Sequence, residues 1–270
     1  MINIGRWRYF TTALIFLIPI FLVLPILVLF WASVLPYFAK PSLKALSSVT
    51  LANYAYVFEN PLVVGAFKNS LMISIASSTA TILLTAVAAW IVVRTNIRGK
   101  WLLDHLASFN LVFPGVVLGI ALLLTYLTLP VPIYGTVWIL GVAYVTRYIP
   151  YGIRFCYPGL LQINKELEES AQMSGAPWGL VFRKIIVPLM MPSLFAGWIY
   201  VFLHSVRELS VAVLLSRPGT EVVAVLMFDM WGRGETPQIG AFGIVLTFIL
   251  VGLSAVFHKL STRYGLQTRN

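Results

Sequence analysis

The chain has 270 residues, of which 59% are apolar and only 10% are charged, and its formal net charge is +10. Soluble domains are typically about 45–50% apolar and about 25% charged, so the composition excludes an ordinary soluble protein, and the apolar content excludes a disordered one. Because one membrane-spanning helix needs about 20 residues, the length accommodates roughly five to seven spans.

The first predicted element is a membrane span at about Thr12–Tyr37. Arg6 and Arg8 precede this apolar run, as in a signal peptide, but the run exceeds the 7–15 residues of a signal-peptide core. No small-residue cleavage pattern ends it, so we expect an uncleaved span. Pro19 and Pro25 are compatible with a membrane helix, because neighbouring groups satisfy the freed carbonyls.

Five further apolar runs follow the first span. Each is far longer than the 4–8 residues of a strand and lacks the alternation of a barrel wall, so each predicts a helix. The expected fold class is therefore all-α, a membrane bundle of six transmembrane helices in a single domain that covers residues 1–270. The runs lie at about Leu71–Val93, Leu103–Leu127, Gly135–Ile149, Pro192–Leu215 and Ile239–Phe257.

Basic residues are distributed unequally between the two sides of these spans. Thirteen lie at the termini and in the second-to-third and fourth-to-fifth connections, five lie in the other connections, and Arg207 lies inside the fifth span. Because Lys and Arg accumulate in cytoplasmic loops, this distribution predicts two cytoplasmic termini. The basic residues stand between apolar runs rather than on one polar face, so we expect contact with membrane lipid and none with nucleic acid.

The connection at residues 162–188 carries the signs of a short first helix. Asn164 is a favourable N-cap, and Glu166 and Glu168 complement the positive end of a helix dipole. Gly175 stands where the helix should stop, because glycine readily takes the left-handed conformation that ends many helices.

A second helix is predicted in the same connection. Pro177 suits its first turn, Arg183 and Lys184 its last turn, and Pro188 should end or kink it before the membrane. The expected helix-turn-helix exposes apolar side chains and is a candidate docking element for a soluble partner. An amphipathic loop lying on the membrane surface is the alternative that these helix patterns leave open.

Three ionisable residues, His204, Arg207 and Glu208, lie near the outer part of the fifth span. Charges inside a membrane are costly and usually face a cavity or a partner. His204 precedes Glu208 by four residues, so the two can share a helix face. Two roles stay open: structural pairing, of Glu208 with Arg207 or with tyrosine or backbone groups, and the lining or gating of a translocation path.

Seven residues of the 162–188 connection stand at the spacing E-A-A-x3-G-x9-I-x-L-P: Glu169, Ser170, Ala171, Gly175, Ile185, Val187 and Pro188. This pattern resembles the EAA loop of ABC importer permeases, in the loop where that family carries it. Ser170 replaces the first Ala and Val187 replaces Leu, and both changes are mild in size. Four separated elements of the pattern coincide, which makes the resemblance specific.

The resemblance extends along most of the chain. Asn69-Ser70 opens the second span as in many of these permeases, and Val49–Tyr54 is similar to the segment that leads into the family's core. The run that begins Pro114-Gly115 and the run that begins Arg207-Glu208 are similar to the third-span motif and fifth-span end of one branch. That branch serves ferric iron, thiamine, polyamines, sulfate and phosphonates. Two such units are often fused in the ferric-iron group, and whether this chain is a subunit or half of a fused protein stays open.

The resemblance implies a type I (MetI-like) permease fold in the inner membrane and a set of partners. These are a second permease subunit or fused half, two cytoplasmic ATPase subunits that bind the EAA loops, and an extracytoplasmic substrate-binding protein. The chain contains no G-x-x-x-x-G-K-[ST] phosphate loop, so ATP and Mg²⁺ should bind the partner ATPase and this chain should be neither an enzyme nor a cofactor carrier. The implied substrate is ferric iron or another small solute.

Two other classes of function are weighed against this one. An ion-coupled secondary transporter is disfavoured by the EAA spacing and by the shortage of carboxylates inside the spans. An integral-membrane enzyme would need a catalytic cluster at one membrane face. The three histidines are not at metal-ligand spacing and Cys156 is the single cysteine, so no metal site is expected.

Overall fold

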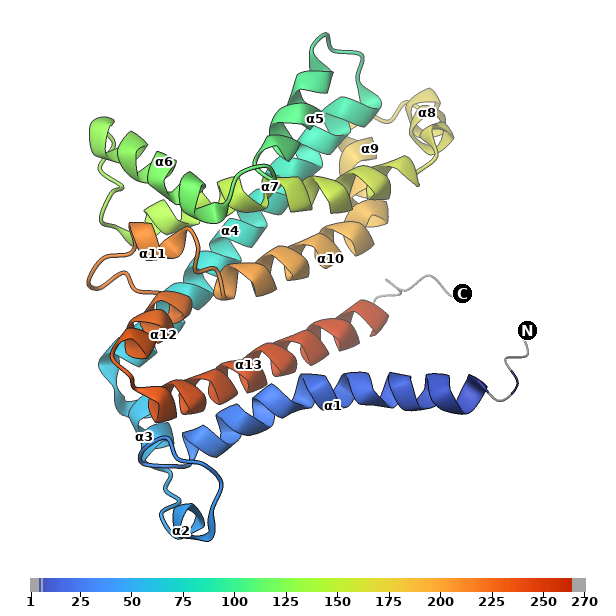
Figure 1. Ribbon diagram of the computed structural model, residues 1–270. Helices are drawn as coiled ribbons and strands as arrows, with labels where there is room; N and C mark the ends of the chain where they lie inside the picture. Colours follow the sequence, from blue (N-terminus) through green and yellow to red (C-terminus); the bar gives the residue numbers. More distant parts are fainter. Residues whose placement is uncertain (1–4, 6, 264–270) are drawn as a thin grey trace. The chain divides into compact units, whose positions relative to one another are not determined.

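Every regular element in the described part of the chain is a helix (Figure 1). The structure is a computed structural model that describes residue 5 and residues 7–263, so Arg6 and Arg269, two of the basic residues in the predicted charge distribution, lie outside it. The helices are α1 (Trp7–Ser33), α2 (Leu43–Leu46), α3 (Ala52–Glu59), α4 (Pro61–Arg94), α5 (Lys100–Phe109), α6 (Gly115–Thr128), α7 (Val137–Leu161), α8 (Lys165–Met173), α9 (Trp178–Val181), the π-helical turn η1 (Phe182–Ile186), α10 (Val187–Val206), α11 (Ala212–Leu215), α12 (Val223–Gly232) and α13 (Thr236–Arg263).

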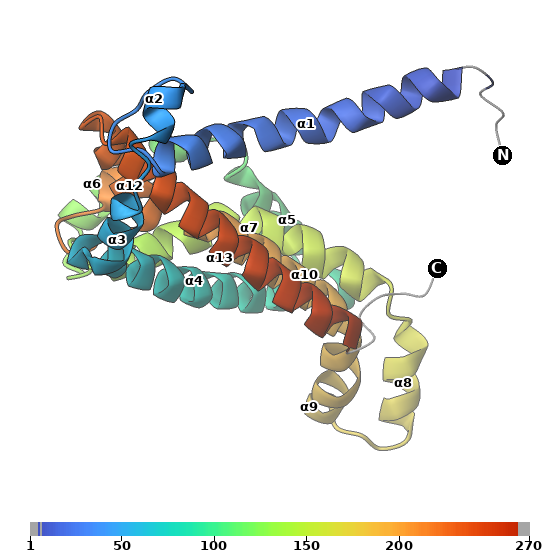
Figure 2. The ribbon, with the colours of Figure 1, turned by 90° about the horizontal axis from the view of Figure 1, so that it is seen from below.

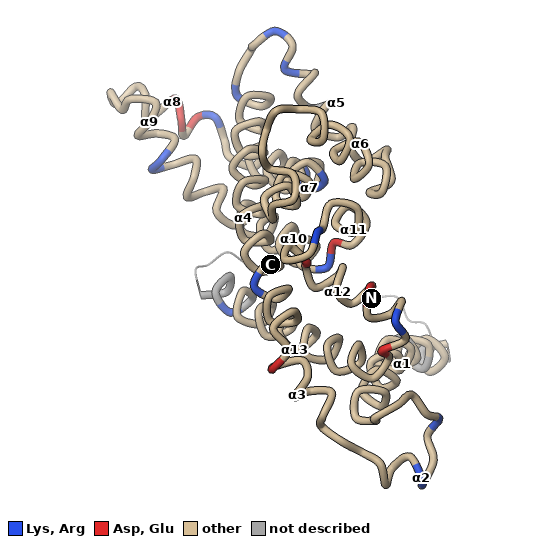
Figure 3. Tube along the Cα trace, turned by 90° about the vertical axis from the view of Figure 1, so that its left-hand side faces the viewer, with Lys and Arg blue, Asp and Glu red and all other residues tan. Residues whose placement is uncertain are grey.

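Four helical stretches of the described chain are long and apolar enough to cross a membrane: Tyr9–Ser33, Pro61–Arg94, Trp178–Val206 and Thr236–Phe257. They overlap the first, second, fifth and sixth predicted spans. The predicted fourth span, at residues 135–149, forms the first part of α7, and this helix continues to Leu161. Arg147 and Arg154 lie within α7 and lower its hydropathy. Charged residues are otherwise found mainly in loops and at helix ends (Figure 3).

The predicted third span, at residues 103–127, is not one continuous helix. Helix α5 ends at Phe109 and α6 begins at Gly115. Pro114 has extended backbone angles, φ −55° and ψ 143°, directly before α6. The Asn110 side-chain amide donates a hydrogen bond of 2.8 Å to the Thr146 carbonyl of α7, which holds the break against that helix. The cause of the break is thus proline together with a tertiary hydrogen bond.

The predicted fifth span, at residues 192–215, is also interrupted. Helix α10 ends at Val206, and the chain becomes helical again only at Ala212 of α11. The carboxylate of Glu208 accepts a hydrogen bond of 3.2 Å from the Val211 N–H, as an N-cap side chain does at a helix start. This local bond favours a new helical turn over continuation of α10.

The structure divides into two compact units, Met1–Val64 with Met227–Val251 and Gly65–Leu226 with Gly252–Asn270. In the first unit, a Cβ on Gly240 of α13 would lie 2.9 Å from the Leu29 carbonyl oxygen, too close for a side chain. Glycine is therefore what lets α13 approach the end of α1. Much of the remaining apolar surface of α1 is exposed, as suits a helix that lipid surrounds.

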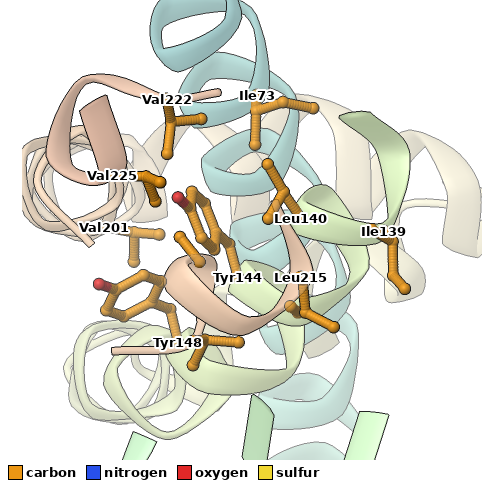
Figure 4. Close-up of a cluster of buried hydrophobic side chains, with 12 residues drawn as sticks. Ile73, Ile139, Leu140, Tyr144, Tyr148, Val201, Leu215, Val222 and Val225 are labelled. Atoms are coloured by element: carbon orange, nitrogen blue, oxygen red, sulfur yellow. The ribbon is translucent and has the colours of Figure 1, made fainter. Parts of the chain in front are cut away.

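The second unit is built around α4, α7 and α10. Helices α7 and α10 lie side by side (Figures 1 and 2). Figure 4 shows Tyr144 and Tyr148 of α7 packed with Val201 of α10 and Val222, which precedes α12. A Cβ on Gly152 of α7 would lie 2.6 Å from the Thr85 hydroxyl of α4. Small residues thus allow these helices to pack closely, as is common in membrane bundles.

Candidate functional site

Helix α8 forms the first arm of the predicted helix-turn-helix, at one end of α7 and α10 (Figure 2). The Asn164 side chain accepts a hydrogen bond from the Glu166 N–H, as predicted for an N-cap. At the other end, the Ala176 N–H donates to the Ala171 carbonyl at 3.1 Å and the Gly175 N–H donates to the Gln172 carbonyl at 2.9 Å. These two bonds are the Schellman pattern that closes a helix.

Gly175 has φ of +84°, the left-handed conformation that the sequence predicted for it. A Cβ added there would have no atom within 4 Å, so the space around it is open and the constraint on the residue is its backbone conformation. This explains a glycine at this position of the pattern without reference to any partner.

The second arm runs from α9 through η1 into α10 without a break. Pro188 was expected to end or kink this arm. It does not end the arm, because η1 continues directly into α10 and Pro188 is the second residue of α10. The π-helical turn at Phe182–Ile186 immediately precedes it. A wider turn of this kind changes the helix path before the proline and often lies at functional sites.

Arg94, the last residue of α4, ties the helix-turn-helix to the spans. Its Nε atom lies 2.6 Å from the Oε1 atom of Glu168, and the two side chains are only 7% and 13% exposed. Its Nη2 atom donates to the carbonyls of Leu160 at 3.3 Å and Ile163 at 2.6 Å. One guanidinium therefore joins α4, the end of α7 and α8. This role of Arg94 is not visible in the sequence, where it is one of several loop charges, because its acidic partner lies 74 residues along the chain.

Aromatic side chains support the same junction. The Trp90 ring of α4 meets the Trp178 ring at 5.1 Å between centroids, and Trp178 stacks on Phe182 at 5.3 Å. A pocket of about 250 Å³ lies between Trp90, Arg94, Trp178 and the α8 residues that include Glu169. The second arm thus rests on α4 through ring contacts.

The residues of the EAA-like pattern fall into two groups by exposure. Ala171, Ile185 and Val187 are half-buried and contribute to packing. Four residues are exposed and form the outward surface of the helix-turn-helix: Glu169, Ser170, Gly175 and Pro188.

Glu208 occupies a second polar site, inside the second unit. It is 9% exposed, and its Oε2 atom accepts a hydrogen bond of 2.6 Å from the Tyr148 hydroxyl while Oε1 accepts from the Val211 N–H. The Tyr144 hydroxyl donates to the Glu208 backbone carbonyl at 3.4 Å. Of the two pairings considered from the sequence, tyrosine and backbone groups therefore satisfy this carboxylate.

Arg207 and His204 do not pair with Glu208 in the described structure. Arg207 is exposed, and its Nη2 atom lies 3.5 Å from Nε2 of His204. The His204 ring stacks on Tyr200 at 4.1 Å between centroids. Of the pairings left open, the structure thus shows the one with tyrosine and backbone groups, because α10 ends between His204 and Glu208 and the break turns the carboxylate inward.

Motifs that are distant in sequence meet at these helix ends. Gly115 and Gly119 of α6 face the segment after Glu208: a Cβ on Gly115 would lie 2.7 Å from the Ser210 Cβ, and one on Gly119 would lie 3.0 Å from Leu214 Cδ1. The two motifs that begin at Pro114 and Arg207 are thus in direct contact.

Asn69 and Ser70 also have structural roles. The Asn69 amide donates to the Glu221 carbonyl at 3.0 Å, and the Ser70 hydroxyl accepts from the Val223 N–H at 2.8 Å. The pair therefore holds the start of α12 against α4.

Comparison with known proteins gives one family and several relatives. Residues 81–263 match the family described as binding-protein-dependent transport system inner membrane component. The chain is 30% identical over 242 residues to the trehalose transport system permease protein SugB of Mycobacterium tuberculosis, covering 87% of this chain and 88% of SugB. It is 25% identical over 213 residues to the spermidine/putrescine transport system permease protein PotC of Escherichia coli, covering 78% of this chain and 80% of PotC.

A third relative is longer than this chain. The ferric transport system permease protein FbpB of Actinobacillus pleuropneumoniae is 28% identical over 214 residues, which are 78% of this chain but 31% of FbpB. The chain thus matches about a third of that relative's length.

Solved structures share the fold. A bacterial ABC transporter involved in the import of alginate superposes with a TM-score of 0.73 at 17% identity, covering 95% of this chain and 96% of the other. A chain of the MetNI methionine ABC transporter gives 0.61 at 15% identity, covering 76% and 96%. At these identities the likeness establishes the helical arrangement alone.

Proposed function

We propose a function from one premise: the chain belongs to the family of binding-protein-dependent transport system inner membrane components, and it has the MetI-like fold of ABC importer permeases. Within that family, we propose that this chain forms half of a solute path through the inner membrane. A second permease subunit or a fused half would supply the other half. An ion-coupled secondary transporter is not favoured, because the family that the chain matches is binding-protein-dependent.

The helix-turn-helix of α8, α9 and η1 is the proposed site of ATPase coupling. The single observation that supports this most is an exposed hairpin whose sequence has the EAA spacing and whose base is fixed to two spans through Arg94. A soluble ATPase that binds Glu169 and its exposed neighbours would pull on α8. Because the tether is largely buried, this displacement would reach α4 and α7. ATP and Mg²⁺ would bind the two ATPase subunits, and this chain would carry no cofactor.

The remaining partners and the substrate follow from the relatives. An extracytoplasmic binding protein would deliver solute to the outer face, and both termini of this chain would be cytoplasmic. The relatives are named for ferric, polyamine and trehalose transport systems. A small solute is common to these names, and ferric iron is the first candidate because the motif resemblance is to that branch.

The coupling site is tested with two substitutions, Glu169→Lys and Gly175→Asp, in the complex with its ATPase. Glu169→Lys reverses an exposed charge on α8, and Gly175→Asp strains a backbone with positive φ at a cost of about 1 kcal/mol or more. Both should abolish ATP-driven uptake and reduce co-purification of the ATPase, while the protein still inserts in the membrane.

Matched controls separate these effects from general damage. Glu59→Lys makes the same charge change at an exposed site of α3, on the predicted external side. Gly99→Asp makes the same substitution at another positive-φ glycine with open surroundings. Both controls should keep ATPase binding. Full binding and full uptake in both test variants would contradict the coupling role.

A further inference from the structure

Three arginines lie along one face of α7 and α10. Arg147 and Arg154 are seven residues apart on α7, which places them on the same side of a helix with 3.6 residues per turn. Arg207 follows the last residue of α10. The two helices are joined along this face by rings, because Tyr151 and Tyr200 lie 5.4 Å apart between centroids. The arginines therefore belong to one surface rather than to separate sites.

The length of α7 would place this surface within a bilayer if α7 crosses it as the predicted fourth span. Helix α7 has 25 residues, which corresponds to about 37 Å, whereas the hydrocarbon core of a bilayer is about 30 Å thick. Arg147 lies about 15 Å and Arg154 about 26 Å from the start of the helix, at a rise of about 1.5 Å per residue. The hydrogen bond from Tyr148 to Glu208 brings Arg207 to the level of Arg147. Charged residues at such depth usually face a water-filled path and mark it.

Two broken helices end at the same level. The Arg147 Nη1 atom donates to the Phe113 carbonyl at 3.2 Å, in the break between α5 and α6. Glu208 and Val211 lie in the break between α10 and α11. Non-helical backbone within a membrane is tolerated only where protein buries it or where it lines a cavity, and solute sites of transporters are often built from such interrupted helices.

The surface continues toward the cytoplasmic end of α7. The Tyr200 ring contacts Phe155 at 5.4 Å and His204 at 4.1 Å. Arg154 and Phe155 then line a cavity of about 560 Å³, which also reaches Asn164 at the start of α8. A solute that passed Arg207 would therefore meet rings and Arg154 before it reached this cavity.

No carboxylate neutralises these arginines within the described residues. Arg147 has a backbone carbonyl as its partner, and the Nη2 atom of Arg207 lies 3.5 Å from Nε2 of His204. Arg154 is exposed and forms no hydrogen bond or ion pair in the described structure. The nearby acid, Glu208, faces Tyr148 and the Val211 N–H instead. The surface is thus cationic, with no acidic side chain paired to it among the described residues.

We propose that this surface is the transit site for an anionic solute, one that carries a carboxylate, phosphate, sulfate or related oxyanion group. The proposal rests on the proposed importer function and names its substrate class. A guanidinium presents a planar set of donors that matches such groups in two-point hydrogen bonds. A free polyamine or thiamine would be repelled at three successive positions. Ferric iron fits only as an anionic chelate, in which carboxylate or phosphate ligands outweigh the charge of the metal.

The first test uses the complete transporter in proteoliposomes, with its binding protein outside and ATP inside. The probes are radiolabelled phosphate, sulfate, aminoethylphosphonate and ferric citrate as anions, and putrescine and thiamine as cations. ATP-driven uptake of an anion and of neither cation is the expected result. Uptake of putrescine or thiamine would overturn the anion proposal and leave the importer function standing. No uptake of any probe, together with no bound ATPase, would overturn both.

The second test locates the site by restoring charge. Arg207→Cys and Arg154→Cys should each lower anion uptake by at least tenfold. A cationic methanethiosulfonate should restore a large part of the uptake, whereas a neutral reagent of similar size should not. Arg98→Cys, at an exposed residue of the α4–α5 connection, is the matched control and should transport normally with either reagent.

Three outcomes would overturn the assignment of the site. Anion uptake that is unchanged in both variants would show that the solute does not use this surface. Equal recovery with the neutral reagent would show that the arginines fill space. Loss of the second permease subunit from the purified variant complexes would show that the arginines bind that subunit instead.

Discussion

The side chain of Arg94 connects the end of α4 with the end of α7 and with α8. Its guanidinium binds the Glu168 carboxylate and the carbonyls of Leu160 and Ile163, and its side chain is 7% exposed. Removal of one partner of a largely buried ion pair typically costs about 3–5 kcal/mol, because the other charge stays buried without compensation. The Arg94 contacts therefore hold α8 to the ends of α4 and α7, as the proposed coupling requires.

Arg94→Gln should lower both stability and coupling, and Glu168→Gln should do so less, because Arg94 keeps its two carbonyl partners. The expected loss for Arg94→Gln is about 3 kcal/mol or more in the free energy of unfolding, with less solute moved per ATP hydrolysed. Thermal unfolding and the ratio of transport to hydrolysis measure the two effects. Glu166→Gln, two residues away and exposed, is the control. Equal effects of Glu166→Gln and Glu168→Gln would contradict the tether.

Tyr148→Phe should destabilise the second unit, because the Glu208 carboxylate would keep only the Val211 N–H as a donor. A hydrogen bond to a charged group contributes about 1.5–3 kcal/mol, so a clear drop in the unfolding temperature is expected. Tyr126→Phe is the control, since no hydrogen bond of its hydroxyl is found in the described structure. If both substitutions shift the unfolding temperature equally, the bond to Glu208 is unimportant for stability.

At the scale of whole helices, the sequence predicts those helix ends that depend on residues within one turn. Asn164 and Gly175 limit α8 as expected, because a cap and a left-handed glycine act within one helical turn. The helix breaks after Phe109 and Val206 were missed, because apolar residues dominate both flanks and an average of hydropathy over a span passes through each break, even across Arg207 and Glu208. Arg94 was missed for another reason: its partner is 74 residues away, and only the fold brings them together.

Two glycines of α6, Gly115 and Gly119, allow this helix to contact residues 210–214, which include the start of α11. A Cβ on Gly115 would lie 2.7 Å from the Ser210 Cβ, so Gly115→Ala should force the segments apart. Overpacking of this kind costs about 1–3 kcal/mol, and a lower unfolding temperature with reduced uptake is expected. Gly65→Ala on α4, where a Cβ meets no atom within 4 Å, should be neutral or slightly stabilising. A neutral Gly115→Ala would show that the two segments separate easily.

For the whole molecule, the charge distribution predicts which side each loop faces. With thirteen basic residues on one side and five on the other, we expect the helix-turn-helix and both termini to be cytoplasmic, where an ATPase could bind. Ser174 and Lys44 test this orientation, because both are exposed, one beside Gly175 and the other on α2. The one native cysteine, Cys156, is buried, so the unmodified chain gives a low labelling background.

Ser174→Cys and Lys44→Cys should therefore react from opposite sides of the membrane. In intact spheroplasts, a membrane-impermeant maleimide should label Lys44→Cys at once and Ser174→Cys only after permeabilisation. Prior treatment with a non-fluorescent impermeant thiol reagent should block the first variant and spare the second. Labelling of both variants in intact cells would place the helix-turn-helix outside, where no ATPase could reach it. The proposed coupling and the six-span arrangement would then both fail, because three predicted spans lie between the two residues and labelling from the same side requires an even number of crossings between them.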